Sequence, residues 1–206
     1  MKKLTSSLGL VALLALILSN QVKADIIVNT GTPDQTGSPI GLADWSWLAA
    51  EFTTTQTWQI TSLKGFINAD TSNQANATYT VAIYDNASNN RPDTTSERFA
   101  QQATFGNDGW NGLQGLNVTL NAGTYWLAFE VRADETLQGL MPVSAPNPLQ
   151  TASNDATGNA GYIPTTGANY HFGVQISAVP VPPSLLLFAS GLLAMGGRRL
   201  VKRQSI

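Results

Sequence analysis

The sequence predicts an all-β fold, an antiparallel β-sandwich, with an apolar segment before it and a proline-rich, apolar and basic segment after it. The middle of the chain is made of short segments in which apolar and polar residues alternate. Clusters of Asn, Gly, Asp, Thr and Pro separate these segments, as turns separate antiparallel strands. The same region shows no heptads and no long amphipathic pattern, so a helical domain is not expected.

Residues 1–24 have the features of a secretory signal peptide. Lys2 and Lys3 give a positive start, residues 8–18 form an apolar run interrupted only by Gly9, and small or modest side chains lead to Ala24. As a helix this run would span only ~16 Å of a ~30 Å hydrocarbon core, which favours a cleaved signal over a permanent anchor. We therefore expect signal peptidase to cut after Ala24.

Residues 25–178 are predicted to form the sandwich domain. Alternation is clearest in 79–83, 116–120 and 125–132, and residues 121–123 (Asn-Ala-Gly) are expected to make a tight hairpin turn. Further strands are expected at 26–29, 50–53, 59–67, 98–105 and 171–177, with weaker candidates at 40–43 and 137–141. Roughly seven to nine short strands favour a sandwich of jelly-roll character.

The core and the loops of this domain can also be predicted. The expected core residues are Trp58, Phe66, Ile83, Leu127 and Phe129. Residues 142–167 are rich in Asn, Thr, Ala and Gly and are expected to be an irregular surface loop. The chain has no cysteine, so an exported domain must be stabilised by its core, and thiolate metal sites and thiol nucleophiles are excluded.

The charges divide the chain into three parts. All thirteen acidic residues lie between Asp25 and Asp155, whereas seven of the eleven basic residues lie in the two end segments. The predicted domain therefore carries a formal charge of −9 and repels nucleic acid and anionic lipid. We expect no nucleic-acid partner.

Residues 179–206 form a three-part tail. It begins with a proline-rich motif that is extended because its prolines cannot continue a helix: Val179, Pro180, Val181, Pro182 and Pro183. A hydrophobic segment at 184–201 follows, and it ends in a basic cluster at 198–203: Arg198, Arg199, Lys202 and Arg203. The segment is apolar all round, so an amphipathic core helix is not favoured. Its uncharged part spans ~21 Å as a helix, and snorkelling basic side chains extend its reach in a bilayer. The positive-inside rule then places the domain outside the cytoplasm.

This tail resembles the PEP-CTERM sorting signal of Gram-negative bacteria, which combines a V-P-E-P-like motif, a short hydrophobic helix and an arginine-rich end. Val179, Pro180 and Pro182 match, while Val181 replaces the usual glutamate, so the tail is similar to a V-P-x-P variant. The resemblance implies an inner-membrane precursor that an exosortase-type membrane peptidase cleaves. It also implies delivery to the cell surface or to the extracellular polysaccharide matrix of a biofilm.

A second resemblance lies inside the domain. The run from Gly109 to Arg132 is similar to ectodomains often attached to such tails, with a Trp-Gly-Leu loop, a strand and an "AGTYW" hairpin. This resemblance favours the β-sandwich and implies no molecular activity.

No catalytic pattern is evident in the sequence. His171 is the only histidine and lies in a predicted strand, and no G-x-S-x-G motif accompanies it. Glu130 and Asp44 are one conceivable carboxylate pair for glycoside hydrolysis, but the sequence does not select them over other acids. We therefore expect a protein that is not an enzyme.

Two kinds of binding site are candidates. Asp85, Asn89 and Asp93 offer oxygen ligands that suit Ca²⁺, although the same residues are ordinary turn formers. Trp45, Trp47 and Trp110 lie beside Asp and Asn residues and could hold a glycan, or could instead plug the open ends of the sandwich. The sequence thus predicts an exported matrix protein with a structural or interaction role. The alternatives are a carbohydrate-binding module and, least favoured, a calcium-dependent hydrolase.

Overall fold

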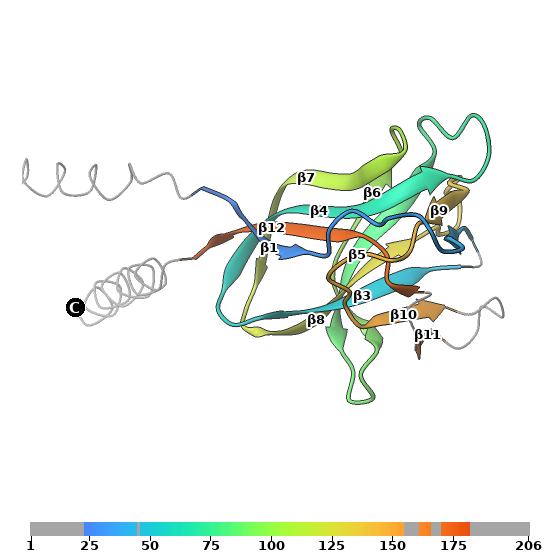
Figure 1. The fold of residues 1–206 in the computed structure, drawn as a ribbon. Coiled ribbons are helices and arrows are strands. Elements are labelled where there is room, and N and C mark those ends of the chain that lie inside the picture. Colours follow the sequence, from blue (N-terminus) through green and yellow to red (C-terminus); the bar gives the residue numbers. More distant parts are fainter. Residues whose placement is uncertain (1–22, 45, 155–160, 166–169, 182–206) are drawn as a thin grey trace, which may run out of the picture.

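The computed structural model describes residues 23–44, 46–154, 161–165 and 170–181. These residues form twelve strands in two six-stranded sheets, and every strand pairing among them is antiparallel (Figure 1). The predicted all-β sandwich is therefore confirmed. Most of the predicted signal peptide and the tail from Pro182 onward lie outside the described residues.

None of the described segments contains a helix long and apolar enough to cross a membrane.

The first sheet has the order β1–β12–β4–β9–β2, and β7 also pairs with β4. Its strands are β1 (Asp25–Asn29), β2 (Ile40–Leu42), β4 (Trp58–Ala69), β7 (Gly109–Leu120), β9 (Gly139–Met141) and β12 (Val174–Pro180). The long strand β4 is the central strand of this sheet, because it pairs with β12, β7 and β9.

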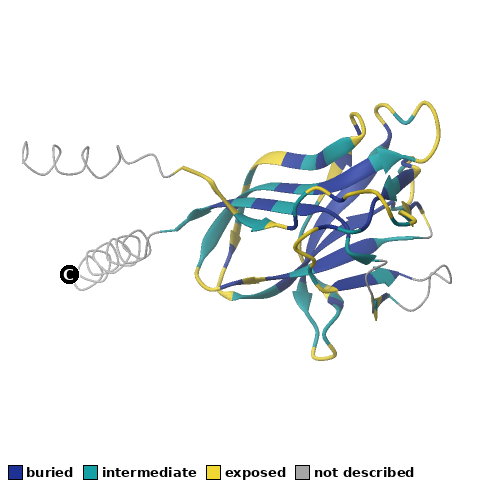
Figure 2. Cartoon of the chain, viewed as in Figure 1, coloured by how far each residue is buried: buried dark blue, intermediate teal, exposed yellow. Residues whose placement is uncertain are grey.

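The second sheet has the order β11–β10–β3–β8–β5–β6. Its strands are β3 (Leu48–Thr54), β5 (Thr78–Asn86), β6 (Pro92–Thr104), β8 (Gly123–Glu130), β10 (Thr151–Asn154) and β11 (Tyr162–Thr165). Residues 125–130 of β8 and 79–84 of β5 are all buried, so the middle of this sheet is covered on both faces (Figure 2).

The main hydrophobic core lies between the sheets. Ile83, Leu127 and Phe129 have no exposed surface and belong to this core, as predicted. Trp58 is only half-buried and packs against the edge of the core. Phe66 is buried, but it does not belong to the core between the sheets. A Cβ on the preceding Gly65 would meet Phe129, so residue 65 faces the core and the alternation of the strand turns Phe66 outward.

The expected hairpin at residues 121–123 is wrong. Strand β7 pairs with β4 in the first sheet, whereas β8 pairs with β3 and β5 in the second, so this turn crosses between the sheets. The crossing places the apolar side chains of β7 and β8 on opposite sides of one core instead of side by side in one sheet. The Trp-Gly-Leu segment, expected to be a loop, is instead part of strand β7 and pairs with β4.

Every predicted strand segment overlaps an observed strand, but two strands were not predicted. Strands β10 and β11 lie within residues 142–167, where an irregular loop was expected. Strand β10 (Thr-Ala-Ser-Asn) has few strand-forming residues, and it forms because the edge of β3 offers it a partner. Strand β11 (Tyr-Ile-Pro-Thr) does contain strand formers, but Pro164 interrupts them, and it pairs with β10. The last strand begins at Val174, so His171 precedes it and does not lie within it as expected.

A straight row of alanines crosses the outward face of the second sheet. Register places Ala152 opposite Ala49, Ala49 opposite Ala128, and Ala82 opposite both Ala128 and Ala100. The row forms a shallow channel because alanine carries only a methyl group. Large side chains fill the space above it, since Trp126, Tyr84 and Tyr162 are buried in the same outer cluster as these alanines.

We expect Ala128→Leu to destabilise the domain by ~1–3 kcal/mol, because extra methyl groups in the channel displace the aromatic rings packed there. The free energy of unfolding in urea measures this. Thr119→Leu, at an exposed site on β7, is the control and should change the stability by less than ~0.5 kcal/mol. Equal effects of the two substitutions would contradict the packing described.

Candidate functional site

The two ends of the domain lie side by side in the first sheet. Strands β1 and β12 pair with Asp25 opposite Ala178, so the first residue after the predicted signal cleavage meets the last residue before the sorting motif. Figure 1 shows both ends leaving the sandwich on the same side. Two predicted processing sites more than 150 residues apart in the sequence are therefore brought to one edge of the fold.

The beginning of the predicted sorting motif is held in the sheet. Val179 and Pro180 pair with Gln59 and Trp58 of β4, and the Val181 amide donates a hydrogen bond of 3.2 Å to the Thr57 carbonyl. Pro180, which lacks an N–H, is tolerated because it is the last residue of the strand. The rest of the predicted motif, Pro182 and Pro183, and the basic residues of the tail lie outside the described residues.

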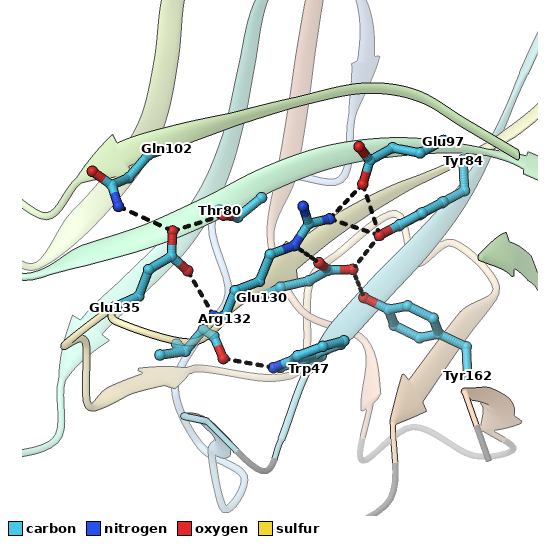
Figure 3. Close-up of polar contacts among 10 residues, drawn as sticks. Trp47, Thr80, Tyr84, Glu97, Gln102, Glu130, Arg132, Glu135 and Tyr162 are labelled. Carbon is cyan, nitrogen blue, oxygen red and sulfur yellow. Dashed lines mark hydrogen bonds and ion pairs between the residues drawn. The ribbon is translucent and has the colours of Figure 1, made fainter. Parts of the chain in front are cut away.

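A buried carboxylate organises the outward face of the second sheet (Figure 3). Glu130, at the end of β8, has no exposed surface. Its Oε1 accepts hydrogen bonds from the hydroxyls of Tyr84 (2.9 Å) and Tyr162 (2.6 Å), and its Oε2 accepts one from Arg132 Nε (2.6 Å). The rings of the two tyrosines lie 6.1 Å apart above the alanine channel. Glu130 therefore connects β8, β5 and β11 at one point.

Arg132 lies between two carboxylates. Its Nη2 donates to Glu97 Oε2 at 2.6 Å and to the Tyr84 hydroxyl at 2.8 Å, so the guanidinium bridges β6 and β5. Burial alone would lower the pKa of Arg132, but the charge of Glu130 and the hydrogen bonds to Glu97 and Glu130 raise it above its usual range. The arginine thus stays charged and neutralises Glu130.

A second carboxylate fixes the turn after β8. Glu135 Oε2 accepts the Arg132 amide at 2.7 Å, and its Oε1 accepts the Thr80 hydroxyl at 2.7 Å. Nearby, the indole of Trp47 donates to the Val131 carbonyl at 2.9 Å. These bonds hold the segment that carries Arg132, and therefore position its guanidinium.

The arrangement around Glu130 is suited to cross-linking strands. Both oxygens of its carboxylate are engaged, and a group without exposed surface cannot contact a substrate in this conformation. Asp44, its conceivable partner in hydrolysis, is exposed beyond the end of β2 and makes no hydrogen bond or ion pair with Glu130. The geometry does not bring these two residues together as a catalytic pair.

The candidate calcium ligands are engaged with their own neighbours. Asp85 is paired with Arg98 at 2.7 Å and accepts a hydrogen bond from Ser96, and the Arg98 hydrogen bond holds the pKa of Asp85 below its usual range. Asp93 caps a turn by accepting the amide (3.0 Å) and hydroxyl (2.6 Å) of Thr95, while Asn89 is exposed. Across the described part of the chain, no three His, Cys, Asp or Glu side chains are grouped as a metal site would require.

Trp47 and Trp110, the two candidate tryptophans that the structure describes, do not form one platform. Trp47 packs against the outer cluster of the second sheet, and Trp110 lies on β7 of the first sheet. Trp110 packs edge to face against Phe66, with ring centroids 5.5 Å apart and planes at 90°. Trp45 lies outside the described residues.

A comparison with models of known protein families finds none that matches this chain, and a comparison with curated proteins also finds no match.

Sequence reasoning missed most of the Glu130 cluster. The alternation of β8 indicates that Glu130 and Arg132 share a face, two positions apart, and this was the available signal. Tyr84 directly follows the predicted strand 79–83. The sequence does not show that this strand lies beside β8, which is what brings Tyr84 to Glu130. Tyr162 could not be found, because it belongs to β11, whose residues were assigned to a loop.

We expect Glu130→Ala to lower the free energy of unfolding by ~3 kcal/mol, because it leaves Arg132 without a buried partner and removes two tyrosine acceptors. Asp85→Ala is the matched control: it breaks an ion pair whose arginine side chain is 57% exposed, and should cost less than ~1 kcal/mol. Urea unfolding of both variants measures the two losses of stability. A loss for Glu130→Ala no larger than that for Asp85→Ala would contradict the role assigned to Glu130.

The tyrosines predict a loss of stability in alkali. Burial, and then the charge of Glu130, raises the pKa of Tyr84 and Tyr162 well above the ordinary 10.0, and burial does the same to the pKa of Tyr79. Above about pH 10 the unfolded chain loses these protons while the folded chain keeps them, so folding becomes less favourable as the pH rises. Each tyrosine should contribute a fall of up to ~1.4 kcal/mol per pH unit.

Urea unfolding at a series of pH values from 8 upward measures this slope. Tyr84→Phe should make the fall in the free energy of unfolding with pH less steep by up to ~1.4 kcal/mol per pH unit, whatever its effect on stability at neutral pH. A stability that does not change through about pH 11 would contradict the burial of these hydroxyls.

Proposed function

We propose that the protein is an exported, non-enzymatic component of the bacterial cell surface or of the extracellular matrix, delivered by a C-terminal sorting signal. The observation that carries this proposal is the pairing of β1 with β12, which places the predicted signal cleavage site and the sorting motif at one edge of the domain. A domain whose two ends leave from the same side can stand on a membrane with its whole body directed away from it.

The steps follow from the order of the segments. Signal peptidase cuts after Ala24, and the hydrophobic segment at 184–201 holds the precursor in the inner membrane with its basic end in the cytoplasm. An exosortase-type peptidase then cuts within residues 179–183 and transfers the domain to the surface or the polysaccharide matrix. The signal helix, the short transmembrane helix and the jelly-roll character of the sandwich are parts of this proposal.

A structural role fits the chemistry of the domain. The buried carboxylate of Glu130 is paired with Arg132 and connects strands, and Asp85 and Asp93 are engaged by neighbouring side chains. These contacts support a stable, cysteine-free body more than a reaction centre. The formal charge of −9 favours solubility outside the cell and disfavours a nucleic-acid partner.

The intact mass of the protein recovered from cells and from the medium tests the proposal. We expect a species that begins at Asp25 and ends within residues 179–183. Pro182→Ala, which alters the motif, should leave a membrane-bound species that begins at Asp25 and still ends at Ile206. Pro39→Ala, at an exposed proline of the domain, should be processed like the wild type.

The same measurement in cells that lack the exosortase completes the test. Only the species ending at Ile206 should be found there, in the membrane fraction. Protein that is free in the medium of those cells would overturn the proposal, and so would a Pro182→Ala variant that is processed as fast as Pro39→Ala.

A further inference from the structure

Charged residues are distributed unevenly between the two sheets. The six strands of the first sheet contain one acid, Asp25, and one base, Lys64. The strands of the second sheet contain Glu51, Asp85, Asp93, Glu97, Arg98 and Glu130. Strands β4, β7 and β12 have no acidic residue at all, although the domain as a whole carries −9. The outward face of the first sheet is therefore almost uncharged.

Register identifies the side chains that share this face. Because Gly65 faces the core, Lys64 and Phe66 on either side of it point outward. Phe66 is opposite Trp110 on β7, and Lys64 is opposite Gly112 on β7 and Gln175 on β12.

The row continues to the edge of the sheet. Gln175 is opposite Asn29 on β1, and its amide donates a hydrogen bond of 3.3 Å to Asn29 Oδ1. The next row across the same strands contains Ile26, Ser177, Ser62 and Gln114, of which Ile26 is an exposed apolar residue and the others are polar. We call these residues the Trp110 face: Asn29, Ser62, Lys64, Trp110, Gln114, Gln175 and Ser177.

Trp110 is rigidly supported on this face. Phe66, which packs edge to face against it, is buried, and a Cβ on Gly173 would meet Phe66 at 2.7 Å, so Gly173 also lies close against Phe66. Trp110 itself remains partly exposed. The next outward position of β7 is Gly112, where a Cβ would collide with the Leu63 carbonyl at 2.1 Å, so no side chain can stand there beside the indole. The ring therefore borders an open position opposite Lys64.

The polar groups extend away from this ring in a line. The row Gly112, Lys64, Gln175 and Asn29 crosses four adjacent strands, a span of ~14 Å at ~4.8 Å per strand. Lys64 is partly exposed and makes no ion pair with any described residue, so its ammonium donors are not committed to a carboxylate there. This row of side chains therefore presents amide donors and acceptors and one ammonium group. Its length matches several linked sugars and exceeds that of a single sugar.

We infer that the Trp110 face binds an uncharged, hydroxyl-rich polysaccharide. A sugar ring has an apolar side that can stack on an indole and a rim of hydroxyls that hydrogen-bond to amides, and this face presents one indole beside a row of amides and hydroxyls. A polyanion is disfavoured because the domain is strongly acidic and the face contributes a single lysine. A protein partner is disfavoured because the face lacks a broad apolar centre. The inference names a partner for the proposed surface role, and rests on that role only in placing the polysaccharide outside the cell.

Affinity electrophoresis of the full-length chain in mild detergent tests the inference. The gels contain one of four neutral polysaccharides, namely hydroxyethyl cellulose, mixed-linkage β-glucan, galactomannan and dextran, or polygalacturonate as the charged comparison. We expect at least one neutral polymer to retard the wild type, with little change when the salt concentration is raised, because no ion pair is involved. Trp110→Ala should weaken that binding at least tenfold, and Gln175→Ala should weaken it several-fold.

Gln101→Ala, an exposed glutamine on β6 of the second sheet, is the matched control and should bind like the wild type. Gln175→Ala is at the surface and removes no core contact, so it keeps the test valid should Trp110→Ala disturb Phe66. No retardation in any neutral gel, tighter binding to polygalacturonate, or equal binding by wild type, Trp110→Ala and Gln175→Ala would each overturn the inference. Because the assay uses the unprocessed chain, its outcome is independent of whether the sorting tail is cleaved.

Discussion

The burial of the Glu130 carboxylate is the constraint on which the second sheet depends. A charge without solvent must be neutralised and hydrogen-bonded, and here Arg132, Tyr84 and Tyr162 meet that need from three separate segments. The tyrosine hydroxyls can reach Glu130 only if their rings lie close to the sheet. The alanine row provides the room for them, with a methyl group at each of five adjacent strands. Small side chains and a buried charge are thus two parts of one arrangement.

This arrangement lets a cysteine-free domain bury both faces of a sheet. The main core uses aliphatic and aromatic side chains between the sheets, and the outer cluster uses aromatic rings above alanines with a polar centre. The first sheet is built differently: apart from Phe66, Trp110 and Ile26, the outward-facing residues along β1, β12, β4 and β7 that the register identifies are small or polar and nearly uncharged. The second sheet therefore carries most of the charged residues and is covered on both faces, whereas the first sheet offers an accessible outward surface.

The sequence predicts where most strands lie along the chain, but it does not predict which strands pair with one another. Alternation in segments such as 79–83 and 125–132 reports which side chains face a core, and those strands were found. It does not report which strand lies next to which, so the turn at 121–123 was read as a hairpin although it crosses between the sheets. Strand β10 has little intrinsic signal and forms against the edge of β3, and β11, a four-residue segment that contains Pro164, pairs in turn with β10. For this reason Tyr162, and with it the full cluster around Glu130, lay beyond sequence reasoning.

The position of β12 also determines how the domain would bear a load. In the anchored precursor that we propose, the tail would pull on the chain from the Pro180 end, along the direction of the strand. Strand β12 is hydrogen-bonded on both sides, to β1 and to β4, along most of its length. A pull along its axis therefore stretches both ladders together in shear, and does not open them one bond at a time as a peeling force does. If the opposite force is applied through Gln175 on the same strand, the tension passes through only a few residues and bypasses the rest of the sandwich.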